Sequence, residues 1–122
     1  MRSEKPVILV VEDEAVVRMM AVIVAEESGF EAISAATADE AIKILESRSD
    51  IRLVFTDVNM PGSMNGLRLA HAIRGRWPPV ELLVTSALGS ITAKDLPHRG
   101  RFLAKPYDVA TLSDAFQQMA GD

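Results

Sequence analysis

The feature of this chain that most constrains its fold is a series of five short apolar runs separated by helical patterns. The runs span residues 7–11, 30–35, 51–56, 80–85 and 101–104. Several are apolar throughout instead of alternating, which is typical of parallel strands buried on both faces. Consecutive parallel strands need a crossover, so the sequence predicts an α/β protein in which helices cover both faces of one parallel sheet.

Four helices are predicted between and after these runs. Thr37 and Glu40 have the spacing of a capping box, Asn65 precedes a helix that cannot continue past Pro78, and Asp108 is the predicted cap of the last helix. The first helix ends before a glycine at position 29. Its apolar side chains are expected to pack on the sheet as one stripe: Val16, Met20, Ile23 and Val24, with Met19 beside them.

The fourth crossover, from Leu88 to Gly100, differs from the others. It contains Gly89 and Pro97, which leaves room for one or two helical turns at most. We expect this connection to be short and weakly helical.

Polar residues follow or close four of the five apolar runs. They are Glu12, Asp13, Asp57, Thr85 and Lys105. The carboxyl ends of parallel strands meet at one edge of a sheet, where open α/β sheets bind their ligands. The sequence therefore predicts that three carboxylates, a hydroxyl and an ammonium group converge on one crevice.

Three carboxylates this close repel one another unless a cation lies among them, and oxygen ligands favour Mg²⁺. His71 and His98 are too isolated in the sequence to indicate a zinc site. A carboxylate can attack phosphorus and form an aspartyl phosphate, whose oxygens Mg²⁺, Lys105 and Thr85 would neutralise or bind. Phosphoryl transfer is thus the predicted chemistry.

Composition excludes several other classes of protein. The chain has no cysteine, so disulfides and thiolate metal sites are excluded. Its 122 residues suit one domain, and its 13 basic and 17 acidic residues give a net charge of −4 with no concentrated basic segment. Direct nucleic-acid binding is therefore not expected. The opening apolar run is far shorter than the ~20 residues that span a bilayer, so we expect no membrane association and a cytoplasmic location.

Four segments resemble the receiver domain of two-component response regulators. They span residues 7–14, 55–62, 84–87 and 102–106, and the similarity extends over essentially the whole chain, taken as one receiver domain over residues 1–122. The resemblance implies a flavodoxin-like (βα)5 fold, a doubly wound parallel five-stranded sheet of order 2-1-3-4-5. Here the fourth helix would be short or irregular.

The resemblance also implies a role for individual residues. Asp57 would accept the phosphoryl group, and Mg²⁺ would be bound directly by Asp13, Asp57 and the main-chain carbonyl of Asn59. Glu12 would act on the ion through water.

Three further roles follow from the same resemblance. Lys105 would contact the phosphoryl group, Thr85 would move toward the phosphorylated site, and Phe102 would be the aromatic residue whose rotamer follows it.

The chain departs from the common receiver pattern at four places. Glu12 and Asn65 each replace a more frequent Asp, and Gly62-Ser63-Met64 makes the loop after Asp57 one residue longer. The interval from Thr85 to Lys105 is short, and the deficit falls in the fourth crossover.

The function implied is a switch that accepts a phosphoryl group from a histidine kinase or a histidine phosphotransfer protein and slowly hydrolyses it. Such a domain catalyses only its own phosphorylation and dephosphorylation, and it is not otherwise an enzyme. Its output would pass to a downstream protein or through a homodimer. The chain is either a stand-alone receiver or one excised from a longer protein.

Two alternatives remain open. A haloacid-dehalogenase-type phosphatase also uses a strand-end Asp with Mg²⁺, but its nucleophile follows the first strand, whereas Asp57 follows the third predicted strand. An interaction module that has lost phosphoryl chemistry would not need to keep Asp57, Thr85 and Lys105 together.

Overall fold

The computed structural model describes residues 5–60, 62 and 64–121. The strands are β1 (Val7–Val11), β2 (Glu31–Ala35), β3 (Ile51–Asp57), β4 (Glu81–Ala87) and β5 (Gly100–Lys105). The α-helices are α1 (Ala15–Glu27), α2 (Ala38–Ser47), α3 (Gly66–Arg76) and α4 (Val109–Ala120). Among the residues described, no helix combines the length and apolar character needed to cross a bilayer.

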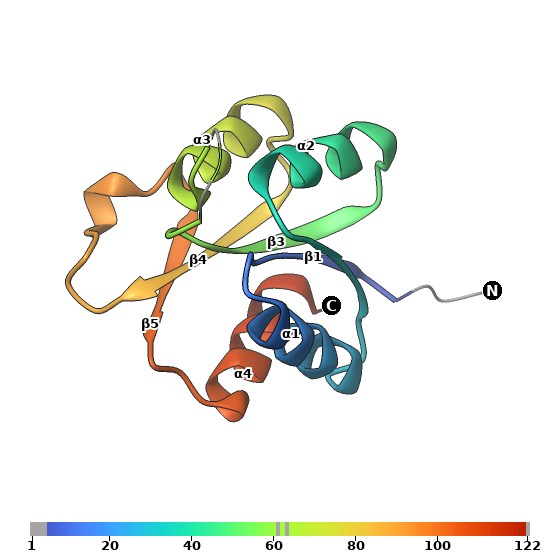
Figure 1. Cartoon of the computed structure of the whole chain (residues 1–122). Coiled ribbons are helices and arrows are strands. Elements are labelled where there is room, and N and C mark those ends of the chain that lie inside the picture. The colour runs from blue at the N-terminus through green and yellow to red at the C-terminus, as the bar shows by residue number, and fades with distance from the viewer. Residues whose placement is uncertain (1–4, 61, 63, 122) are drawn as a thin grey trace.

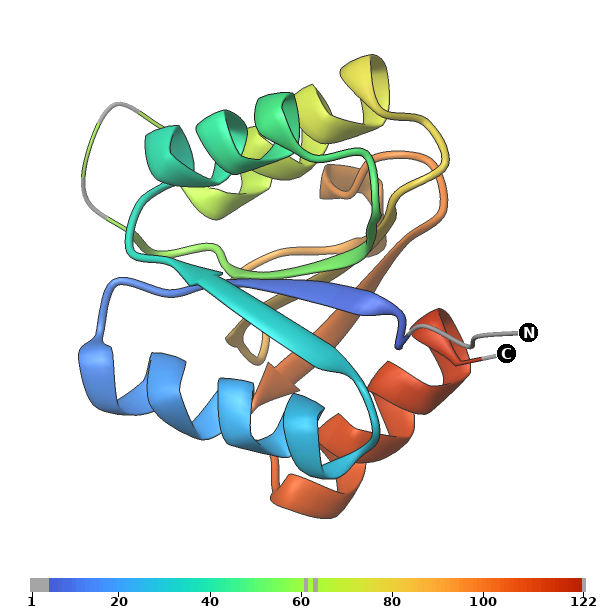
Figure 2. The ribbon, with the colours of Figure 1, turned by 90° about the vertical axis from the view of Figure 1, so that its right-hand side faces the viewer.

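The five strands form one parallel sheet of order β2-β1-β3-β4-β5 (Figure 1). Helices α2 and α3 cover one face, and α1 and α4 cover the other, as the turned view in Figure 2 shows. The predicted flavodoxin-like, doubly wound fold is confirmed.

The core is divided by the sheet into two apolar clusters. In β1, Val7, Leu9 and Val11 pack toward α2 and α3, while Ile8 and Val10 pack toward α1 and α4. All five side chains are buried. This two-sided burial explains why the run is apolar throughout, and it fixes the sheet as the central layer.

The predicted helix caps are confirmed, with one difference in detail. The Thr37 hydroxyl accepts a hydrogen bond from the Glu40 backbone N–H at 3.1 Å, but the Glu40 carboxylate accepts from Ala36 instead of Thr37. Asn65 and Asp108 accept from backbone N–H groups in the first turns of α3 and α4. Each cap satisfies a donor that has no partner within its helix.

The predicted packing stripe of α1 is wrong for most of its members. The large side chains point outward, with exposed fractions of 64% for Val16, 59% for Met19, 55% for Met20 and 44% for Ile23. The buried face is formed by Ala21, Val24 and Ala25. Apolar residues occur on most sides of this helix, so the periodicity of the sequence does not identify the face that packs on the sheet. That face carries small alanines, which allow the helix to lie close to the sheet.

The fourth crossover has little regular structure, as predicted. It contains only a short 3₁₀ helix, η1 (Ala93–Asp95), whose first turn is closed by a capping box between Thr92 and Asp95. Ile91 and Leu96 pack against the apolar cluster under α2 and α3. Two apolar anchors thus replace a complete helix on this side of the sheet.

Candidate functional site

The carboxyl ends of β1, β3 and β5 bring together three of the residues predicted from the sequence. Asp57 ends β3 and is aligned with Thr85 on β4. Lys105 ends β5, one strand further along the sheet. Glu12 follows β1, the neighbour of β3 on its other side. The parallel register therefore brings three of the five predicted polar residues, Asp57, Lys105 and Glu12, to one edge of the sheet.

Asp57 is the central residue of this site and is only 4% exposed. One carboxylate oxygen, Oδ2, forms an ion pair with the Lys105 ammonium, and the other, Oδ1, accepts the Asn59 backbone N–H at 3.0 Å. Burial alone would lower the pKa of Lys105, but the hydrogen bond and charge of Asp57 outweigh it and raise that pKa. Lys105 therefore stays charged beside the Asp57 carboxylate.

Glu12 lies next to this pair and is also buried. Its Oε2 accepts the Glu14 backbone N–H at 3.0 Å, which favours the charged carboxylate. Burial nevertheless raises the pKa of Glu12 to about 7, with further increases from the carboxyl groups of Asp57 and Asp13. Glu12 is therefore a carboxylate whose charged form its buried surroundings stabilise poorly.

The donors present fit a hard divalent cation that keeps part of its water shell. Glu12 and Asp57 are buried neighbours, and Asp13 is exposed beside them. Within the described ranges, no three His, Cys, Asp or Glu side chains are grouped closely enough to hold a metal ion by themselves. Backbone carbonyls and water would have to complete the shell, which is how proteins usually bind Mg²⁺.

Thr85 and Phe102, the predicted switch residues, are placed differently. Thr85 is buried, and its hydroxyl donates to the Leu103 carbonyl at 2.7 Å, across to β5. Phe102 is half-buried on β5, where it borders a shallow pocket between this strand and α4. The structure thus aligns Thr85 with Asp57 in the backbone, while its hydroxyl is bonded to the neighbouring strand.

Gly66 supports Asp57 in a way that the sequence reasoning missed. A Cβ atom at position 66 would lie 1.8 Å from the Asp57 carbonyl oxygen, so only glycine lets α3 approach β3 this closely. The Gly66 N–H also donates to the Val58 carbonyl at 3.0 Å. Of the predicted longer loop, Gly62-Ser63-Met64, Ser63 lies outside the described residues, as does the preceding Pro61.

Two more residues near the site were not predicted. Tyr107 is half-buried, packs edge-on against Phe55 with ring centroids 6.0 Å apart, and has a pKa raised by burial. The Arg18 guanidinium donates to the Glu12 carbonyl at 2.8 Å. The position of Arg18, one helical turn after Glu14, was the only sequence signal for this contact.

Comparison with known proteins assigns the chain to a family. The model for the response regulator receiver domain matches residues 8–117. The chain is 33% identical over 110 residues to the response regulator protein FleR of Pseudomonas aeruginosa, covering 88% of this chain and 23% of FleR. It is 31% identical over 121 residues to the sensor kinase CckA of Brucella abortus, covering 96% of this chain and 13% of CckA. The chain thus spans less than a quarter of either relative.

Solved structures show the same relationship at the level of single domains. The receiver domain of NtrX from Brucella abortus superposes with a TM-score of 0.82 at 32% identity, over 92% of this chain and 96% of that one. The receiver domain of the hybrid histidine kinase CckA superposes with a TM-score of 0.77 at 32% identity, over 93% of this chain and 97% of that one. Sequence and fold therefore agree that the chain belongs to the response regulator receiver domains, the signalling domains of two-component systems.

Proposed function

We propose that this receiver accepts a phosphoryl group on Asp57 from a phosphohistidine of a histidine kinase or a histidine phosphotransfer protein, in a Mg²⁺-dependent reaction, and slowly hydrolyses it. The observation that carries the proposal is the environment of the buried Asp57 carboxylate. It lies between the Asn59 N–H and the Lys105 ammonium, with Glu12 as its neighbour. Nothing in the packing of an α/β core requires this combination.

The reaction uses these groups in distinct roles. A carboxylate oxygen of Asp57 attacks phosphorus, the P–N bond to the donor imidazole breaks, and the departing nitrogen keeps the electron pair. Lys105 exchanges its contact with Asp57 for one with a phosphoryl oxygen, and Thr85 turns from Leu103 toward another. Asp13, Asp57 and the Asn59 carbonyl would hold Mg²⁺, with Glu12 acting through water, and the bound ion would neutralise charge on the phosphoryl oxygens.

The exposed side of α1 supports a protein as phosphodonor. Four large apolar side chains that could have been buried instead face outward: Val16, Met19, Met20 and Ile23. The helix begins at Ala15, two residues after Asp13, so the first turn of this apolar side lies near the phosphoryl site. An exposed apolar patch of this kind marks a surface for protein contact, which a small-molecule donor would not need.

The test is labelling with acetyl phosphate as a small phosphodonor. We expect an acid-labile, hydroxylamine-sensitive adduct that forms with Mg²⁺ and does not form in EDTA. Asp57→Asn should abolish it, whereas Asp50→Asn, at the opposite end of β3, should not. Undiminished labelling of Asp57→Asn would contradict the acceptor assignment, and an unlabelled wild-type protein would favour an interaction module without phosphoryl chemistry.

A further inference from the structure

The side chain of Arg18 holds the acidic loop between β1 and α1. Its Nη1 atom lies 2.8 Å from the carbonyl oxygen of Glu12 and 3.4 Å from that of Asp13. Helical side chains point toward the N-terminus of their helix, so a long residue in the first turn can reach back over the preceding loop. One guanidinium nitrogen thereby contacts two consecutive peptide groups.

The three acidic residues that precede α1, Glu12, Asp13 and Glu14, accommodate a cation at the start of this helix. The N-terminus of a helix carries partial positive charge and favours acidic residues, yet the first turn of α1 has none. The α1 N-cap, Glu14, also makes no capping bond with its side chain. Arg18 thus contacts the backbone of the preceding loop and not an acidic side chain of the first turn.

The loop has few other restraints. The Glu12 N–H donates to the Ala35 carbonyl at 3.1 Å, and the Glu12 carboxylate accepts the Glu14 N–H. The Asp13 side chain is exposed, and in the part of the chain described here only Arg18 donates to the Asp13 backbone carbonyl. The Asp13–Glu14 peptide is therefore held at both ends, by Arg18 at its carbonyl and by the Glu12 carboxylate at its N–H.

We propose that Arg18 is a positioning residue for the divalent cation, acting by fixing the Glu12 and Asp13 peptides so that the Asp13 carboxylate faces the crevice. This inference rests on the proposed function, because it assigns how the chain prepares the same ion site. Groups that orient metal ligands commonly change metal affinity by 10–100-fold when they are removed. Arg18 contacts neither the acceptor nor the donor, so its removal should weaken ion binding without removing the reaction.

The test compares three variants of the whole chain. Arg18→Met keeps most of the apolar stem and removes the donors, Arg18→Lys keeps one charged donor, and Arg48→Met is the control at the far end of the sheet, where Arg48 pairs with Asp50. Mg²⁺ binding is followed by amide chemical shifts, and labelling by acetyl phosphate is measured over a range of Mg²⁺ concentrations. Urea unfolding is recorded for each variant.

We expect Arg18→Met to raise the half-saturating Mg²⁺ concentration about tenfold in both measurements, with a saturated labelling rate within about twofold of the wild type. Arg18→Lys should recover part of the loss, and Arg48→Met should match the wild type. A Mg²⁺ curve for Arg18→Met that superimposes on the wild type, or a lower saturated rate at unchanged half-saturation, would overturn the proposal.

Two outcomes separate this inference from other failures. If Arg18→Met does not fold, Arg18→Lys decides alone: a wild-type Mg²⁺ curve overturns the proposal, and an intermediate shift supports it. If the wild-type protein itself neither binds Mg²⁺ nor becomes labelled, the proposed function fails, and with it the basis of this inference.

Discussion

Thr85 lies directly opposite Asp57 in the sheet, yet its hydroxyl donates to the Leu103 carbonyl at 2.7 Å. Thr85 is 1% exposed and Leu103 is half-buried, so this hydrogen bond is partly shielded from water. If Thr85 turns toward a phosphoryl group, the bond to β5 must break. The contact therefore links β4, the strand next to the acceptor strand β3, to β5, which carries Phe102.

Replacing Thr85 by Val should separate phosphorylation from switching. The change removes the bond to Leu103 and should cost about 0.5–1.5 kcal/mol of unfolding free energy. Labelling on Asp57 should persist, while the chemical-shift changes of β5 on phosphorylation should be lost. Thr85→Ser, which keeps the hydroxyl, is the matched control. Equal β5 responses in the Val and Ser variants would contradict a switching role.

Gly66→Ala should damage the site through the backbone. The new methyl group would meet the Asp57 carbonyl oxygen at 1.8 Å, so α3 must shift, at a cost of about 1–3 kcal/mol. Labelling of Asp57 should slow as well. Gly75→Ala in the same helix meets no atom within 4 Å and should stabilise the protein by up to about 1 kcal/mol. Urea unfolding tests both, and a neutral Gly66→Ala would disprove the steric argument.

The stability of the metal-free protein should fall as pH rises through the range in which Glu12 titrates. Its pKa is raised from 4.5 to about 7 in the folded state, mainly by burial. Between these values the folded chain binds more protons than the unfolded chain, so stability decreases with pH, by up to about 3 kcal/mol. Glu12→Gln should lose this decrease in urea unfolding with EDTA. If the unfolding free energies of wild type and Glu12→Gln change with pH in the same way, Glu12 is not the group responsible.

Asp13→Asn should weaken Mg²⁺ binding more than Glu12→Gln does. A carboxylate bound directly to the ion acts at about 2.0–2.1 Å, whereas one that acts through water is further away. Removing the Glu12 carboxyl also removes the repulsion described above, which offsets part of its loss. Mg²⁺ titration followed by NMR measures both affinities. Equal losses would show that the assumed direct and water-mediated roles are wrong.

The segment 88–100 should be only weakly protected without phosphate and should become ordered when the site is phosphorylated. The segment is held to α3 at its 3₁₀ turn, where the His71 ring donates to the Asp95 carbonyl at 2.7 Å, and after it, where Arg74 donates to the His98 carbonyl at 2.7 Å. Amide exchange with and without beryllofluoride and Mg²⁺ measures the change. Strong protection of Ile91 to Leu96 in both states would exclude this transition.

Sequence patterns predicted the sheet and the meeting of Asp57, Lys105 and Glu12 at its edge because both depend on short, regular signals. Buried parallel strands are apolar on both faces, and their carboxyl ends share one edge, so Asp57 and Lys105 could be placed together before any coordinates. The caps at Thr37 and Asn65 were found for the same reason: each uses a side chain within one turn of its target.

Features that depend on distance in three dimensions could not be predicted in this way. The inward face of α1 is chosen by how closely Ala21 and Ala25 can approach the sheet, which periodicity does not record. The need for Gly66 arises from its contact with a strand that ends nine positions earlier. The bond between Thr85 and Leu103 depends on a rotamer, and no sequence pattern specifies it.

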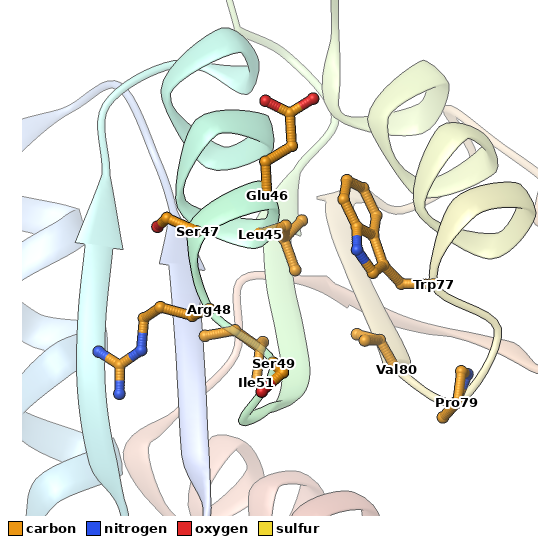
Figure 3. A pocket seen from close by; sticks show the side chains of 9 residues that line it. All are labelled: Leu45, Glu46, Ser47, Arg48, Ser49, Ile51, Trp77, Pro79 and Val80. Atoms are coloured by element: carbon orange, nitrogen blue, oxygen red, sulfur yellow. The ribbon is translucent and has the colours of Figure 1, made fainter.

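The only tryptophan gives the molecule a fluorescent reporter far from its chemistry. Trp77 borders a pocket with Leu45, Ile51 and Val80 at the amino ends of β3 and β4 (Figure 3). The guanidinium carbon of Arg76 lies over its indole ring, 4.4 Å from the ring centroid. Ile51 and Asp57 begin and end β3, so at about 3.3 Å per residue the reporter lies about 20 Å from the acceptor. If Trp77 emission stays constant upon phosphorylation, the structural change is confined to the region around Asp57. A shift of the emission spectrum would show that the change extends through the sheet to the amino ends of β3 and β4.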